Sequence, residues 1–242
     1  MVQYCVMSQS LNQQNKSFWQ KYQPGKIPSS SNNPPDELLN SIHGPILDVG
    51  TGDGNLAEAL ARKGHETYGI DIAENIITEN KKRKTKVNYS VQDITERTNF
   101  PDGFFALLIF RFTLTNIHKE SWDKLAKEIF RILKPSGKVW ILEPLVSESY
   151  KQRYQLASNF IDDRHCVYVF RDKDMAEKIN TKEELAQAIE EKKVSRIVKH
   201  YTVEELQCVF KGLVFEKQRT VVIPSPSGYP INTFEGIFSK HM

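Results

Sequence analysis

The chain has 242 residues, of which 39% are hydrophobic, and it can form one globular domain with a sizeable core and an inserted subdomain. Its formal net charge of +3 is too small to indicate a nucleic-acid partner by itself. Cys5, Cys166 and Cys208 lie far apart, without the spacing of a metal or redox site. We therefore expect a reducing compartment, the cytoplasm, and no metal. The N-terminus lacks a secretory-signal pattern, and no window approaches the 18 or so apolar residues of a membrane span.

The first elements along the chain are an arm and a short helix. Residues 1–35 are mostly polar and include the turn-rich stretch "SSSNNPP", so we expect an N-terminal arm that ends in a linker. Two prolines then precede "DELLNSI", which predicts a short helix that begins near Asp36.

Strand and helix patterns alternate regularly from 44 to 143. We expect strands in "PILDVG", "HETYGID", "KVNYSVQD", "FFALLIFRF" and "GKVWILE", and helices in "NLAEALARKG", "AENIITENKK" and "KESWDKLAKEIFRIL". Alternation of this kind is typical of parallel βαβ units, and the nearly continuous apolar strands indicate burial on both faces of a sheet. The predicted fold class is α/β, with a doubly wound, Rossmann-like and mostly parallel seven-stranded sheet.

The pattern changes after Glu143. Residues 147–200 are highly charged and mostly helix-like apart from a strand in "HCVYVFRD", so we expect an inserted helical cap there. Thr202 and Glu205 then form a capping-box pattern at the start of a helix. A glycine turn and two strands follow, which predict an antiparallel terminal hairpin. The domain of the fold is thus predicted to span 36–242.

The loop in "ILDVGTGDGN" (residues 46–55) is the first sign of chemistry. Glycines occupy every second position from Gly50 to Gly54, which allows the backbone to approach a ligand closely. A dinucleotide fingerprint needs its third glycine where Asn55 stands. The carboxylate of Asp48, just before the loop, suits a cationic group and repels a pyrophosphate. The helix N-terminus after the loop favours an anion. A ligand with an ammonium and a carboxylate is an amino acid.

Two further carboxylates follow neighbouring strands. Asp71 ends the second predicted strand, where a carboxylate can accept hydrogen bonds from ribose hydroxyls. Asp93 ends the third and can accept a hydrogen bond from an exocyclic adenine amine. An amino acid, a ribose and an adenine together describe S-adenosylmethionine (SAM).

The chain resembles the class I SAM-dependent methyltransferases, especially the small-molecule enzymes of ubiquinone and menaquinone biosynthesis (the type 11 branch). The resemblance lies in six segments in the family's order: "ILDVGTGDGNLAEALARKG", "TYGIDIAENII", "SVQDI", "LLIFRFTLTNI", "IFRILKPSGKVWILEP" and "YTVEELQCVFKGLVFEK". They cover 46–145 and 201–217. Each segment alone is a weak signal, but the ordered set is specific.

The resemblance implies a cofactor role for a set of residues. Gly50 and Gly52 would line the methionyl part, with Asp48 and Thr51 in the same loop. Asp71 would hold the ribose. The remaining residues that the resemblance implicates flank the adenine, open onto cofactor and acceptor, or close over the cofactor: Ile72, Asp93, Ile94, Phe110, Arg111, Phe112, Trp19 and Tyr22.

The chain also departs from the family's pattern. Ala106 stands where an aspartate is common, Thr115 and Asn116 replace paired histidines, and Ser136 replaces a glycine. The segment "NPPD" is similar to the N-P-P-[YF] site of amino-methyltransferases, but Asp36 takes the place of the aromatic residue, and we interpret it as a linker. These departures touch the acceptor side and no expected cofactor contact.

The predicted reaction is transfer of a methyl group from SAM to a small-molecule acceptor, by in-line displacement in a closed pocket. A base is needed only where the acceptor must lose a proton. His118, His165 and His200 are candidates for it, and we assign no catalytic residue. Two alternatives stay open: a methyltransferase for RNA or protein, for which the basic run 81–86 would supply a phosphate-binding patch, and a module that binds SAM without turnover. The sequence does not specify the oligomeric state.

Overall fold

The structure is a computed structural model that describes residues 15–21, 32–147, 160–161, 166–170, 179, 181–191, 193–224 and 230–241. The strands are β1 (Ile46–Val49), β2 (Thr67–Asp71), β3 (Asn88–Val91), β4 (Phe105–Arg111), β5 (Leu133–Pro144), β6 (Phe160–Ile161), β7 (Cys166–Phe170), β8 (Val194–Lys199), β9 (Val214–Ile223) and β10 (Ile231–Ser239). The helices are one at 15–20, then α2 (Asp36–Asn40), α3 (Asn55–Arg62), α4 (Glu74–Lys82), α5 (Trp122–Ile132), α7 (Lys182–Glu190) and α8 (Val203–Val209), with short 3₁₀ turns η1 (Leu114–Asn116) and η2 (Lys119–Ser121).

A single seven-stranded sheet forms the centre of the molecule, in the order β3-β2-β1-β4-β5-β10-β9. Strands β1 to β5 run parallel, and β10 is antiparallel to both β5 and β9. The predicted fold class and terminal hairpin are therefore confirmed. The strand order reverses between β1 and β4, which leaves a crevice at the carboxyl ends of these strands, where open α/β sheets bind their ligands.

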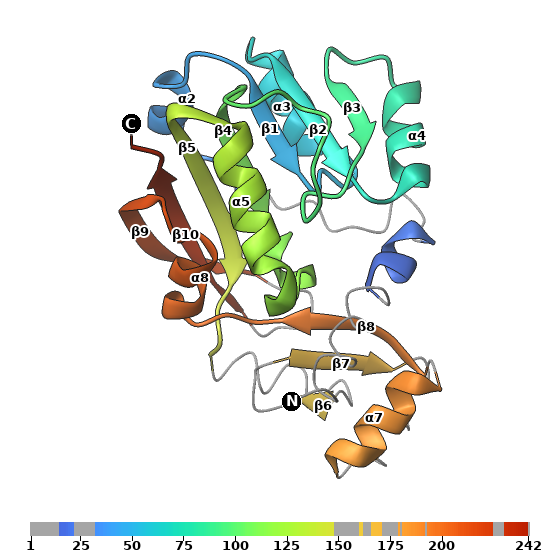
Figure 1. Ribbon diagram of the computed structural model, residues 1–242. Coiled ribbons are helices and arrows are strands. Elements are labelled where there is room, and N and C mark those ends of the chain that lie inside the picture. The colour runs from blue at the N-terminus through green and yellow to red at the C-terminus, as the bar shows by residue number, and fades with distance from the viewer. Residues whose placement is uncertain are drawn as a thin grey trace.

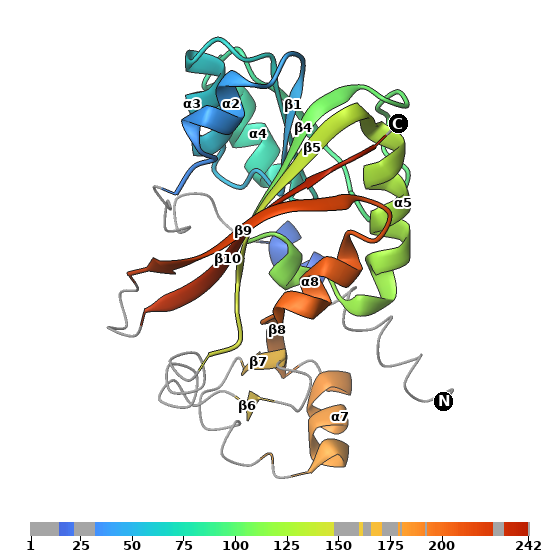
Figure 2. The same ribbon diagram turned by 90° about the vertical axis from the view of Figure 1, so that its left-hand side faces the viewer.

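Helices cover both faces of this sheet, as Figure 2 shows from its edge. Helices α5 and α8 bury an apolar cluster against one face, and α2 and α3 bury a second cluster against the other. Helix α5 does so because its apolar residues recur at helical spacing: Trp122, Leu125, Ile129 and Ile132 are all buried. The capping box at Thr202 and Glu205 is present at the start of α8.

A second, three-stranded sheet lies below the carboxyl ends of the parallel strands (Figure 1), with the order β6-β7-β8. The predicted strand in "HCVYVFRD" is confirmed as β7. The expectation that the rest of 147–200 is mostly helical is wrong for β8, which pairs antiparallel with β7. Its β-branched valines and isoleucine favour a strand, and pairing with β7 satisfies its backbone. Helix α7 is the described helical part of this region.

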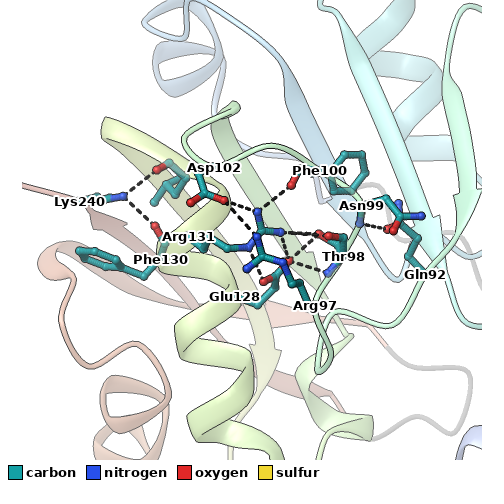
Figure 3. A network of polar contacts seen from close by, with 11 residues as sticks. Gln92, Arg97, Thr98, Asn99, Phe100, Asp102, Glu128, Phe130, Arg131 and Lys240 are labelled. Atoms are coloured by element: carbon teal, nitrogen blue, oxygen red, sulfur yellow. Dashed lines mark hydrogen bonds and ion pairs between the residues drawn. The ribbon is translucent and has the colours of Figure 1, made fainter.

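A polar network fixes the loop between β3 and β4 against α5 (Figure 3). The side chain of Arg131 is 13% exposed and makes two hydrogen bonds, of 2.8 and 2.6 Å, to the carboxylate of Glu128. It also donates to backbone oxygens within 98–102. Within the same stretch, Asn99 donates its backbone N–H at 2.7 Å to Oε1 of Gln92, which stands at the start of the loop. The segment that follows β3 is thus held from both sides.

Candidate active site

A cavity of about 790 Å³ lies where the parallel strands end, between the large sheet and the small one. It is lined by the ends of β1, β2 and β4, by the helix at 15–20, by β8 and by the end of the β9–β10 hairpin where Ile223 pairs with Ile231. Among the site residues predicted from the sequence, those that line it are Trp19, Asp48, Gly50, Thr51, Gly52, Asp71, Ile72, Asp93, Ile94, Arg111 and Phe112. The fold thus brings most of the predicted set around one space.

Of the predicted residues that the structure describes, Phe110 is not part of this lining. Phe110 is fully buried in the core, and its ring centroid lies 5.9 Å from that of Phe210 on the face covered by α5 and α8. Successive side chains of a strand point to opposite faces, so Phe110 points into the core while its neighbour Arg111 reaches the cavity. Phe112 follows the end of the strand with a φ of +56°, which interrupts this alternation, and it also lines the cavity. The structure therefore places Phe110 in the core, and not beside the cofactor as the sequence analysis predicted. Tyr22 lies outside the described residues.

The loop after β1 requires glycine because of its backbone conformation and its close packing against a neighbouring turn. Gly50, Gly52 and Gly54 have φ values of +66°, +52° and +73°, in the left-handed region. A Cβ on Gly50 would lie 2.7 Å from Cγ2 of Thr113, whose hydroxyl donates to the Val49 carbonyl. The loop is thus pressed against the turn after β4, and its backbone forms one wall of the cavity.

Asp48 is buried at the base of this loop, with 3% of its surface exposed. Thr51 donates its hydroxyl to Asp48 Oδ2 at 2.7 Å. Burial raises the pKa of Asp48 to about 6, although the positive charge of Arg111 and the hydrogen bond from Thr51 lower it. A cationic ligand group beside this carboxylate would favour its ionised form.

Asp71 at the end of β2 is already engaged with the backbone. Its Oδ2 accepts the Gly52 N–H at 3.1 Å, and its Oδ1 accepts the Ala73 N–H at 3.0 Å. Burial raises the pKa of Asp71, while these hydrogen bonds oppose the rise. The backbone N–H of Ile72 also acts on this carboxylate. An ionised carboxylate offers about four lone-pair sites, so about one to two of them are left for a ligand.

Asp93 carries the third carboxylate, beyond the end of β3. Its Oδ2 pairs with Lys16 Nζ at 2.5 Å, and its Oδ1 accepts the N–H and the hydroxyl of Thr95 at 2.9 and 2.6 Å. Burial works to raise the pKa of Asp93, but these bonds outweigh it and the pKa is lowered. The pairing ties the helix at 15–20 to the sheet edge.

This helix is also fixed on its other side. Trp19 Nε1 donates to Asn116 Oδ1 at 3.1 Å, and Asn15 exchanges two hydrogen bonds with the backbone of Ile197 in β8, at 2.8 and 2.9 Å. Sequence reasoning assigned Trp19 here but missed Asn15 and Lys16. Lys16 stands three residues before Trp19, a spacing that places both on one helical face, and this signal would have found it.

The turn after β4 has a buried support that the sequence did not reveal. Glu143 is fully buried and accepts the backbone N–H groups of residues 113, 114 and 115 at 2.7, 2.8 and 3.2 Å. Burial raises the pKa of Glu143 to about 8, against the lowering effect of these three donors. Just before the turn, Phe112 adopts a φ of +56°, an uncommon conformation for an aromatic residue and one that recurs at functional sites.

The other predicted candidates fall in different places. None of residues 81–86 lines the cavity. In this run Lys82 pairs with Glu79 and Arg83 pairs with Glu58, so part of its charge supports α3 and α4. His118 is buried and does not line the cavity, whereas His200 does.

His165 lies outside the described residues. Within the described part of the chain, no group of three or more His, Cys, Asp or Glu side chains is arranged to hold a metal ion. No helix described there combines the length and apolarity that crossing a bilayer requires.

Comparison with known proteins agrees with this geometry. Residues 46–137 match a family described as a methyltransferase domain. A ubiquinone/menaquinone biosynthesis C-methyltransferase from Hydrogenovibrio crunogenus is 31% identical over 120 residues, which cover 43% of this chain and 46% of the relative. The chain thus spans about half the length of the curated relatives it matches.

Solved structures share the fold. A SAM-dependent methyltransferase from Methanosarcina mazei aligns with 87% of this chain and 100% of its own, with a TM-score of 0.67 and 20% identity. A 1,6-didemethyltoxoflavin-N1-methyltransferase from Burkholderia thailandensis, solved with 1,6-didemethyltoxoflavin and S-adenosylhomocysteine, aligns with 85% of this chain and 75% of its own, with a TM-score of 0.57 and 13% identity.

Proposed function

We propose that this chain, whose residues 46–137 match a methyltransferase domain family, is a class I SAM-dependent methyltransferase that transfers a methyl group from SAM to a small molecule. One observation carries the proposal: three carboxylates, Asp48, Asp71 and Asp93, lie at or just beyond the carboxyl ends of the neighbouring parallel strands β1, β2 and β3 and line one cavity. Their spacing along the sheet edge suits the amino acid, the ribose and the adenine of SAM in that order.

The residues present fit this cofactor. Asp48 would face the ammonium group, Asp71 would accept from the ribose hydroxyls, and Asp93 would accept from the adenine amine. Ile72 and Ile94 would supply apolar contacts to the base. When bound, SAM supplies a methyl group on a sulfonium sulfur, which is an excellent leaving group. The chain's own task is then to align the acceptor with that methyl group and to exclude water.

A small acceptor suits the enclosure of the cavity. The helix at 15–20 covers it from one side through Trp19 and Lys16, and β8 covers it from another. We propose that the arm (1–35) and the cap (147–200) act as closing elements on a domain that spans 36–242. A folded RNA or protein would need an open approach to the methyl group, and the basic run 81–86 lies outside the cavity lining.

Two measurements test the proposal. Calorimetry should detect SAM binding to the purified chain and no binding of NADH, because the loop lacks the third dinucleotide glycine. Tritiated-methyl transfer from SAM should then label the small-molecule fraction of a cell extract, and not its RNA or protein fractions. Label in RNA or protein would favour the macromolecular alternative, and SAM binding without any labelled product would favour a binding module.

A further inference from the structure

The glycine loop (residues 50–54) is held by three side chains that lie outside the cavity lining. Residues 50–53 line the cavity, whereas the three side chains come from α4, from the residue after α4 and from β3. They bind three consecutive backbone carbonyls of the loop: Asn80 binds that of Gly52, Arg83 that of Asp53 and Tyr89 that of Gly54. We call Asn80, Arg83 and Tyr89 the backing residues.

Asn80 is buried and has a defined orientation. Only 3% of its surface is exposed, its Nδ2 donates to the Gly52 carbonyl at 2.8 Å, and its Oδ1 accepts from Arg83 Nη2 at 2.5 Å. A guanidinium group only donates, so the amide oxygen faces Arg83 and the amide nitrogen faces Gly52. The C=O and N–H of a trans peptide point in opposite directions, so this bond turns the N–H of Asp53 away from Asn80.

Arg83 belongs to the basic run 81–86 but differs from the rest of it. Its Nη2 also donates to the Asp53 carbonyl, and its Nε lies 3.0 Å from Oε1 of Glu58, whose side chain is 11% exposed. The neighbouring Lys82 forms an ion pair at the surface, where its own side chain is 64% exposed. The rigid fork of the guanidinium allows Arg83 to join α3, α4 and the loop at one point.

Tyr89 supports the last carbonyl of the loop. It is 7% exposed, and its hydroxyl donates to the Gly54 carbonyl at 3.3 Å. Burial raises the pKa of this hydroxyl, so it keeps its proton and stays a donor. A Cβ on Gly69 of β2 would lie 2.8 Å from Cδ1 of the ring, and a Cβ on Gly54 would overlap the hydroxyl oxygen. The ring is therefore packed closely between β2 and the loop.

These contacts fix a loop that would otherwise be free to change conformation. Glycine populates the left-handed and right-handed backbone regions about equally, and Gly52 and Gly54 have φ values of +52° and +73°. If the backbone of one such residue became ordered only when a ligand bound, that ligand would bind about 10-fold more weakly. The backing residues fix the loop when the protein folds, so a ligand meets a preformed surface.

The carboxylates expected to bind the adenosine half of SAM have supports of their own. Asp71 accepts the N–H of Ala73 at 3.0 Å, and Asp93 accepts the N–H of Thr95 at 2.9 Å. Loss of a backing residue therefore leaves these two carboxylates in place.

We infer that the backing residues are positioning residues for the cofactor, and that they hold the glycine loop in the conformation that binds the amino-acid half of SAM. This inference rests on the proposed methyltransferase function. The backing residues lie outside the cavity lining, so they act through the loop and not by contact with cofactor or acceptor. Their loss should weaken binding of the amino-acid half and spare the adenosine half.

The test compares two ligands by calorimetry: S-adenosylhomocysteine and 5′-methylthioadenosine, which shares the adenosine and the sulfur but lacks the amino acid. Asn80→Asp keeps the size of the side chain but cannot donate to the Gly52 carbonyl. We expect it to bind S-adenosylhomocysteine about 10-fold more weakly than the parent and methylthioadenosine equally well. Asn88→Asp, at an exposed position of β3 outside the cavity lining, is the matched control and should behave as the parent.

A parent protein that binds neither ligand would defeat the proposed function together with this inference. Where the parent binds both, an unchanged affinity of Asn80→Asp for S-adenosylhomocysteine would overturn the inference alone. An equal loss for both ligands would also overturn it, because a merely structural role weakens the whole site.

Two further variants test the other backing residues. Arg83→Met should weaken S-adenosylhomocysteine about 10-fold and spare methylthioadenosine, whereas Lys82→Met, in the same basic run, should behave as the parent. Equal effects of these two substitutions would show that the charge of the run matters and not the support of the loop, and would overturn the role of Arg83. Tyr89→Phe keeps the packed ring, so it folds even where Arg83→Met does not, and should weaken S-adenosylhomocysteine alone by about 3-fold. An unchanged affinity would overturn the role of Tyr89.

Discussion

Replacement of Asp71 by alanine should weaken SAM binding about 30- to 1000-fold. The structure leaves about one to two lone-pair sites of this carboxylate to a ligand, because the backbone N–H groups of Gly52, Ala73 and Ile72 use the others. Loss of one to two hydrogen bonds to a charged acceptor should cost about 2–4 kcal/mol of SAM binding free energy, because water can only partly replace the carboxylate as the partner of the ligand hydroxyls. Calorimetry with SAM measures the loss directly, and Asp123→Ala, an exposed carboxylate far from the cavity, is the control.

The same substitution also removes two backbone contacts, so a general collapse of the glycine loop must be separated from the loss of ribose contacts. Adenosine and its 2′,3′-dideoxy analogue make this separation, because they differ only in the hydroxyls. The parent protein should bind adenosine more tightly than the dideoxy analogue, and Asp71→Ala should bind both alike. An unchanged SAM affinity, or an unchanged preference for adenosine in the variant, would refute the ribose assignment.

Three further predictions follow from the site and its supports. SAM affinity should fall as the pH drops through about 6, because ionised Asp48 is needed, and calorimetry on Asp48→Asn should give a weaker, pH-independent value. Since the folded-state pKa of Asp48 lies above its ordinary 3.8, its ionisation costs stability as the pH rises from 3.8 to about 6, and that cost should be absent from denaturation curves of the variant. The Gly50→Ala variant should lose at least about 1–2 kcal/mol of unfolding free energy, because alanine adopts the left-handed φ of this position only at that cost. Calorimetry should also show that this variant binds SAM poorly. The Arg131→Met variant should lose about 3–5 kcal/mol of unfolding free energy in urea denaturation, because the buried carboxylate of Glu128 keeps its hydrogen bonds from Thr98 but loses its positive partner. The Lys124→Met variant, from an exposed pair on the same helix, should lose less than about 1 kcal/mol, and equal losses would contradict the buried-pair reasoning.

The sequence by itself determined the alternation of strands and helices between 44 and 143 and the terminal hairpin. Both follow from local patterns: apolar runs for buried strands, helical spacing in α5, and the capping box at Thr202. It also determined which end of the sheet carries the predicted site, because the glycine loop, Asp71 and Asp93 each lie at or just beyond the carboxyl end of a strand. Parallel strands place such residues at one edge whatever the rest of the chain does.

Only the tertiary structure decided the rest. Strand β8 depends on pairing with β7, which lies more than twenty residues earlier in the chain. The local amino-acid composition does not indicate which distant segment a strand will pair with. Phe110 belongs to the core because the pleat of β4 turns it toward α5 and α8. Lys16 meets Asp93, and Glu143 meets the turn after β4, through contacts between segments far apart in sequence. Periodicity and propensity report on neighbours along the chain, whereas these contacts exist only once the sheets and the N-terminal helix have come together.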